Sequence, residues 1–238
     1  MESEKFSLRC DTSLKAILIL TVVIAIILLL GGCIEKPLPP PPAVSPLPIV
    51  TPAQPLPSPK FRILMVIAPE DFRDEELFVP KAIFEEHGAT VEIASTTAKP
   101  ARGMLGAVVE PDVVIPDVTV GNFDAIVVVG GTGSMEYLWD DSDLHTLIRD
   151  AYDAGKVVAA ICLSPVVLAR AGVLEGKKAT VFPSPEAIGE LEKGGATYVD
   201  EEVVTAGNVI TARDPESAED FALTVWAALC NASISTSA

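Results

Sequence analysis

The sequence predicts an α/β protein, in which one mostly parallel sheet carries helices on both faces. Hydrophobic residues make up 49% of the chain but aromatic residues only 5%, so the core must be built from Val, Ile, Leu and Ala. These residue types are typical of buried parallel strands. From residue 60 onward, short apolar runs alternate with longer amphipathic stretches. This alternation is expected of a single domain with a parallel sheet covered on both sides.

Each element is predicted from its hydrophobic period and its flanking turn residues. Uninterrupted runs such as FRILMVIA predict strands at 61–68, 89–95, 124–131, 156–162 and 178–182. Amphipathic stretches, one of them closed by Gly155, predict helices at 75–88, 142–155, 164–172, 184–193 and 215–229. Short β-rich segments are expected at 107–120, and a hairpin across 196–213. The carboxyl ends of parallel strands, where ligands bind in such sheets, are therefore the expected site.

An apolar segment precedes this domain. Residues 16–30 are apolar except for Thr21, and a fifteen-residue helix spans about 22 Å, less than the roughly 30 Å of a bilayer core. The length favours a signal peptide over 1–33. The segment LGGC ending at Cys33 resembles the lipobox of prokaryotic lipoproteins, which implies a lipid on Cys33. The alternative is an uncleaved membrane helix continuing through Ile34. Both predict anchoring at the cell membrane with the domain on the extracytoplasmic side.

A proline-rich linker is predicted at 34–59. Eleven prolines between positions 37 and 59 disfavour helix and sheet and favour polyproline II. At about 3.1 Å per residue, this stalk would extend up to roughly 70 Å. A ligand for proline-binding domains is the alternative function. The globular domain is expected at 60–230, followed by a tail at 231–238.

Charge and cysteine content exclude several classes of function. There are 33 acidic residues against 17 Lys and Arg, a net charge of −16, so a nucleic acid is not an expected partner. The four cysteines, at positions 10, 33, 162 and 230, form no CxxC pair and no zinc-ligand spacing with histidine. Neither a disulfide framework, a metal site nor a cofactor is predicted.

Cys162 ends a buried strand in the stretch VVAAICLSPVVLARAG. Ser164 suits a helix N-cap and Pro165 a first helical position, so a helix should begin just after the cysteine. Its positive dipole end would stabilise a thiolate, and the sharp turn is similar to a nucleophile elbow, although G-x-S-x-G is absent. The alternative is a buried structural thiol, because free cysteine is among the most buried residue types.

The sequence resembles the ThiJ/PfpI family. The matching segments are DEELFVP (74–80), VVVGG (127–131), AAIC followed by Ser164 and Pro165, LARAGVLEGKKATVFPSP (168–185) and ITARDP (210–215). They span nearly all of 60–230 in family order. The resemblance implies a flavodoxin-like fold of the class I glutamine amidotransferase type, and a homodimer or higher homo-oligomer.

Residue roles follow from the resemblance position by position. Cys162 matches the family's reactive cysteine, and Glu76 the acid that hydrogen-bonds its sulfur in the protonated form. Gly130, Gly131 and Leu163 match backbone positions that offer N–H groups to an oxyanion. A first-turn glutamate that complements the helix dipole is the alternative for Glu76, and a tight strand exit is the alternative for the glycines.

Glu136 matches a position where the peptidase branch has an acid that reaches a neighbouring subunit. Arg213 either orients an anionic group or makes a structural ion pair. Pro80 predicts an irregularity in the helix that carries Glu76.

The chain departs from the family at both positions that supply a histidine. The peptidase branch has histidine directly after the cysteine, where this chain has Leu163, and the deglycase branch has one where this chain has Phe182. His87 and His145 are expected on the solvated surface. Without a base that titrates near neutral pH, peptidase activity is disfavoured.

The expected function is that of a membrane-tethered protein with a reactive cysteine, which acts on reactive carbonyls or glycated groups or takes part in the oxidative-stress response. Its partner would be a small electrophile or oxidant. One alternative is a catalytically silent domain that binds a small ligand or protein partner in the same cleft. A chaperone-like holdase is a third.

Overall fold

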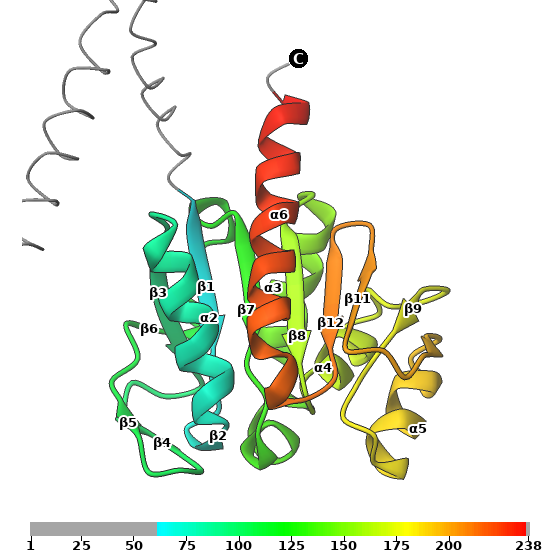
Figure 1. The fold of residues 1–238 in the computed structure, drawn as a ribbon. Helices are drawn as coiled ribbons and strands as arrows, with labels where there is room; N and C mark the ends of the chain where they lie inside the picture. The colour runs from blue at the N-terminus through cyan, green and yellow to red at the C-terminus, as the bar shows by residue number, and fades with distance from the viewer. Residues whose placement is uncertain (1–60, 237–238) are drawn as a thin grey trace, which may run out of the picture. The chain divides into compact units, whose positions relative to one another are not determined.

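The computed structural model describes residues 61–236 (Figure 1). The predicted signal peptide or anchor, Cys33 and the proline-rich linker lie outside the described residues. Among the helices of residues 61–236, none is both long and apolar enough to cross a membrane.

The main sheet has the strand order β11-β12-β8-β7-β1-β3-β6. Every neighbouring pair is parallel except β11 and β12, which form an antiparallel edge. Its strands are β1 (Arg62–Val66), β3 (Thr90–Ser95), β6 (Val113–Val114), β7 (Ala125–Val128), β8 (Val157–Ile161), β11 (Val203–Ala206) and β12 (Val209–Ala212). The α/β prediction of a mostly parallel sheet is confirmed.

Helices cover both faces of this sheet. In Figure 1, α2 and α6 lie in front of the strands and α3 lies behind them. The α-helices are α2 (Asp74–Glu86), α3 (Ser142–Asp153), α4 (Pro165–Arg170), α5 (Pro185–Lys193) and α6 (Ala218–Thr236). All residues of β7 and β8 are buried, which explains why these strands appear in the sequence as continuous apolar runs.

Two small sheets complete the described fold. One has the order β2-β4-β5, from β2 (Glu70–Phe72), β4 (Ala101–Gly103) and β5 (Val108–Val109). The other pairs β9 (Lys178–Ala179) with β10 (Thr197–Tyr198). β2 and β4 were not predicted, because three-residue strands carry no measurable period.

Several predicted boundaries are corrected. The strand expected at 178–182 ends at Ala179 and pairs in parallel with β10, so the hairpin predicted across 196–213 is confined to β11 and β12. α2 runs continuously through Pro80. α6 follows a short 3-10 turn (Pro215–Ser217) and continues beyond position 230 to Thr236.

Candidate functional site

The site forms where β7 and β8 end and α2 begins. Gly130 and Gly131 follow β7, Cys162 follows β8, and Glu76 lies in the first turn of α2. The carboxyl ends of parallel strands meet at one edge of the sheet, and this brings together segments that are distant along the chain. The four positions named from the sequence therefore converge as expected.

Cys162 occupies a strained turn. Its φ is +62°, which non-glycine residues rarely adopt. The backbone is held by hydrogen bonds on both sides: Cys162 N–H donates to the Ala212 carbonyl at 2.9 Å, and Phe182 N–H donates to the Cys162 carbonyl at 2.8 Å. Such strain persists only where surrounding contacts impose it, and is frequent at nucleophiles. The strand-to-helix elbow predicted from the sequence is present.

Ser164 and Pro165 occupy the predicted N-cap and first helical positions of α4, but the capping hydrogen bond expected of Ser164 is absent. Ser164 has helical dihedral angles and its hydroxyl makes no cap; it donates instead to the Val129 carbonyl at 2.7 Å and bonds the Ser134 hydroxyl at 2.7 Å. α4 has six residues, so its dipole is small. The Ser164 hydroxyl thus fastens the elbow to the end of β7.

Glu76 is completely buried. Its Oε2 accepts a hydrogen bond from Gly130 N–H at 2.9 Å, while Oε1 has no N–H or O–H partner among the described residues. Burial raises the pKa of the Glu76 carboxyl from its ordinary 4.5 to about 8, against smaller lowering contributions from Cys162, Gly130 N–H and Arg73. The side chain is therefore protonated at neutral pH, as the resemblance implied.

Cys162 and Glu76 behave as one coupled pair. Cys162 is 6% exposed, and burial, followed by the negative charge of an ionised Glu76, raises the pKa of its thiol well above the ordinary range. When Glu76 carries its proton, that charge is absent and the carboxyl can donate to the sulfur. The N–H groups of Gly131 and Leu163 lower the thiol pKa. Burial therefore acts against the thiolate in both states, and the thiolate is less disfavoured with Glu76 neutral than with Glu76 ionised.

Both glycines are required by close contacts. A Cβ at Gly130 would lie 2.5 Å from Glu76 Oε2 and 2.7 Å from the Cys162 Cβ. Gly131 has φ +102° and lies against the backbone of Asp71 and Arg73. A larger residue at Gly130 would therefore push on Glu76 and Cys162 directly, and one at Gly131 would push on the segment that precedes α2.

The three predicted oxyanion amides do not have the same partner. Gly130 N–H is bound to Glu76, whereas Gly131 and Leu163 N–H groups face the Cys162 sulfur. When the sulfur adds to a substrate carbonyl, the negatively charged oxygen would therefore accept hydrogen bonds from the N–H groups of Gly131 and Leu163. That role stays a prediction.

The other predicted residues have polar partners outside this pair. Glu136 is exposed on a short π-helix, Ser134–Leu138, and interacts with its neighbour Tyr137. Arg213 binds Asp214 at 2.8 Å and Asp200 at 3.3 Å. Of the two roles considered for Arg213, these contacts match the structural ion pair.

Neither described histidine replaces the missing base. His87 is exposed at the end of α2, as expected, and its Nδ1 lies 2.8 Å from the Ile83 carbonyl. His145 was also expected on the solvated surface, but it is half-buried, with Nε2 2.9 Å from the Trp139 carbonyl. Burial lowers the pKa of His145.

Arg73 is a residue that sequence reasoning missed. Its backbone N–H donates to the Gly130 carbonyl at 3.0 Å, and its charge lowers the pKa of Glu76. No motif marks it, because its importance comes from the approach of the β7 end to the start of α2. The described residues contain no cluster of His, Cys, Asp and Glu that could hold a metal ion.

Comparisons with known proteins agree with this fold. The sequence profile of the DJ-1/PfpI family matches residues 61–228. An uncharacterized protein of Methanocaldococcus jannaschii is 56% identical over 168 residues, covering 71% of this chain and 82% of that protein. The glutathione-independent glyoxalase DJR-1.2 of Caenorhabditis elegans is 30% identical over 162 residues, covering 68% and 85%. The crystal structure of a ThiJ/PfpI domain protein from Brachyspira murdochii has 36% identity and a TM-score of 0.69, covering 72% of this chain and 98% of that chain.

Proposed function

Because this chain belongs to the DJ-1/PfpI family, we propose that Cys162 is its reactive centre and that the domain acts on small reactive carbonyl compounds. The observation that carries the proposal is the pairing of a strained cysteine with a buried, protonated Glu76 and two backbone N–H groups. Similarity to a protein named as a glyoxalase supports the same class of substrate.

The first step is addition of sulfur to an aldehyde carbon. The thiol proton leaves to water, the sulfur forms a bond to carbon, and the electrons of the C=O double bond move onto oxygen. That oxygen takes the proton of Glu76, which regains one from water. Thiol and aldehyde thus give a thiohemiacetal without net change in protons. Gly131 and Leu163 N–H groups are placed to stabilise the negative charge as it develops.

A 2-oxoaldehyde needs two further proton transfers. The proton on the former aldehyde carbon leaves and one is added to the adjacent carbon, while the hydroxyl proton of the thiohemiacetal passes to the oxygen on that adjacent carbon. The product is a thioester, which water hydrolyses to a 2-hydroxy acid and the free Cys162 thiol. Glu76 is the acid–base group within reach of Cys162 among the described side chains. Amide hydrolysis stays disfavoured, because its amine leaving group requires a stronger proton donor.

Oxidation of the same sulfur by peroxide is the second reaction that we propose. The thiolate attacks one peroxide oxygen, the O–O bond breaks, and a sulfenic acid and hydroxide form. It requires the same protonated Glu76 and the same access to Cys162. Exposure to peroxide and measurement of added oxygen on Cys162 would test it.

We also propose that the domain is held at the membrane, on the extracytoplasmic side. The support is the apolar stretch 16–30, the Gly31-Gly32-Cys33 sequence and the eleven prolines that follow. Intact-mass analysis of the native protein tests this. We expect a diacylglyceryl group on Cys33. An unmodified chain that begins at Met1 would instead support the alternative of an uncleaved membrane helix.

The central test compares the two thiols of the described domain. Cys162 should react with iodoacetamide at neutral pH many times faster than Cys230, measured by peptide mass. Turnover of methylglyoxal should be lost in Cys162→Ala and retained in the control Cys230→Ala. Equal labelling of both cysteines, or turnover that survives Cys162→Ala, would contradict the proposal. Binding without turnover would favour the catalytically silent alternative.

A further inference from the structure

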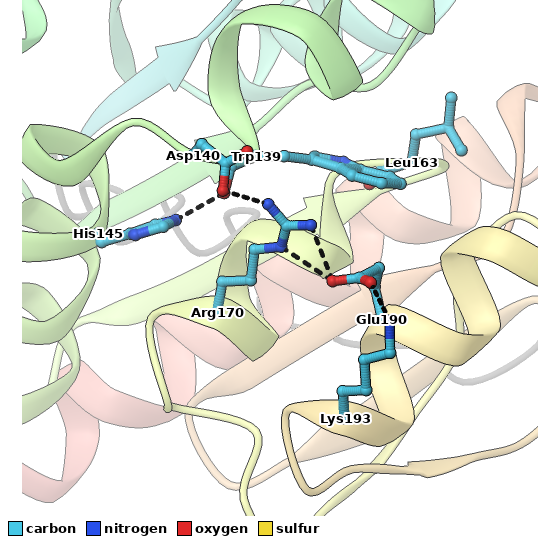
Figure 2. Close-up of polar contacts among 7 residues, drawn as sticks. All are labelled: Trp139, Asp140, His145, Leu163, Arg170, Glu190 and Lys193. Carbon is cyan, nitrogen blue, oxygen red and sulfur yellow. Dashed lines mark hydrogen bonds and ion pairs between the residues drawn. The ribbon is translucent and has the colours of Figure 1, made fainter.

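The peptide bond between Leu163 and Ser164 is held by a buried tryptophan. The indole Nε1–H of Trp139 donates a hydrogen bond to the Leu163 carbonyl at 2.8 Å. Trp139 is 4% exposed and lies immediately after the π-helix, so the bond connects the β7–α3 segment to the elbow. Figure 2 shows the indole beside Leu163.

The tryptophan is itself held from two sides. The Arg170 guanidinium lies over its ring, 5.2 Å from the centroid, and binds Asp140 and Glu190, the latter at 2.8 Å (Figure 2). His145 Nε2 lies 2.9 Å from the Trp139 carbonyl, so it is the donor in that contact. Stacking of a guanidinium on an indole adds attraction to the ion pairs. The ring therefore has a fixed position and orientation.

A fixed ring matters because the elbow is strained. With φ at +62°, Cys162 would gain free energy if the backbone around it could relax. Rotation of the 162–163 peptide is opposed by Phe182 N–H on the Cys162 carbonyl, and movement of the next peptide is opposed by Trp139 on the Leu163 carbonyl. These two bonds keep the Leu163 N–H directed at the sulfur.

We propose that Trp139 is a positioning residue for Cys162: its indole N–H holds the Leu163 carbonyl, and this restrains Leu163 so that its own N–H stays on the sulfur. The inference deepens the proposed function and rests on it, since positioning matters only if the sulfur reacts. It also assigns a role to Leu163, whose backbone is used although its side chain cannot replace the missing histidine. Arg170 holds Trp139 in place.

Trp139→Phe tests this, because it keeps an aromatic ring under Arg170 and removes the N–H. The rate of Cys162 alkylation by iodoacetamide is measured from pH 5 to 10 on the full chain. We expect the rate to fall about three- to tenfold at pH 7 and the rising part of the profile to move to higher pH by about half to one unit, the loss expected for one buried hydrogen bond. Trp226→Phe, which changes a tryptophan packed edge-on against Phe61, is the matched control and should leave the profile unchanged.

A profile identical to wild type in Trp139→Phe would overturn the inference. Hydrogen exchange of the Leu163 amide is a second readout that does not depend on reactivity, and it should become faster in Trp139→Phe only. If Trp139→Phe does not fold, Arg170→Met carries the test, with a smaller shift in the same direction expected and no shift overturning it. Failure of the proposed function is distinguishable, since the wild-type Cys162 would then be no more reactive than Cys230.

Discussion

Replacing Glu76 with glutamine converts the buried carboxyl into a group that cannot ionise. The amide oxygen can still accept the hydrogen bond from Gly130 N–H, and the shape of the side chain is kept. Because burial raises the pKa of Glu76 to about 8 in the folded protein from an ordinary 4.5, the folded state binds its proton more tightly than the unfolded state. The contribution of this proton to stability is complete below about pH 4.5 and is lost as the pH rises to about 8.

The size of the effect follows from the two pKa values. At 1.36 kcal/mol for each pH unit, the difference between 4.5 and about 8 corresponds to roughly 5 kcal/mol. Wild-type protein should lose this free energy of unfolding between pH 4.5 and 8, and Glu76→Gln should not. The variant should therefore be more stable than wild type at pH 8 by several kcal/mol, with the gap closing toward pH 5.

Urea unfolding followed by circular dichroism at pH 5, 6, 7, 8 and 9 measures this difference. Glu86→Gln, which removes an exposed carboxyl from the same helix, reports the general effect of one fewer negative charge. If the stability curves of wild type and Glu76→Gln run parallel across this range, the carboxyl does not carry a raised pKa and the protonated-acid mechanism fails.

Two other substitutions test how the site is supported. Gly103→Ala should destabilise the protein by about 1–3 kcal/mol in urea unfolding, because a Cβ there would lie 2.5 Å from both carboxylate oxygens of Asp74. The control is Gly121→Ala, which should change stability little because the space around Gly121 is open. Ser164→Ala should cost about 1–3 kcal/mol, because the buried Val129 carbonyl loses its hydroxyl donor, and it should slow Cys162 alkylation by loosening the elbow. Stability equal to wild type in either Gly103→Ala or Ser164→Ala would contradict these contacts.

Much of the site was predictable because its residues occupy the ends of strongly patterned elements. Cys162, Gly130 and Gly131 follow runs of buried residues, and the order of strands and helices places those ends at one edge of the sheet. Ser164 lies at the predicted N-cap position, but the capping hydrogen bond is absent for a specific reason. A serine before proline has the local pattern of a cap, but this hydroxyl donates to the Val129 carbonyl, just after β7, and caps no amide of α4.

His145 and Trp139 show a second kind of limit. His145 lies in the first turn of an amphipathic helix, where the sequence predicts solvent, yet the carbonyl of Trp139 approaches its ring. Trp139 itself carries no motif, and its partner Leu163 is 24 residues away along the chain. No pattern in the neighbouring sequence predicts either of these hydrogen bonds.

By itself, the sequence determined the alternation of strands and helices, the sharp turn at Cys162 and the absence of a histidine at both family positions, because these depend on residue types and spacing within a few turns. The tertiary structure decided where the protons and hydrogen bonds lie. Glu76 meets Gly130 across 54 residues of chain, and its charge state is set by burial beneath segments that fold around it. Burial is a property of packing in three dimensions, so no local pattern reveals it.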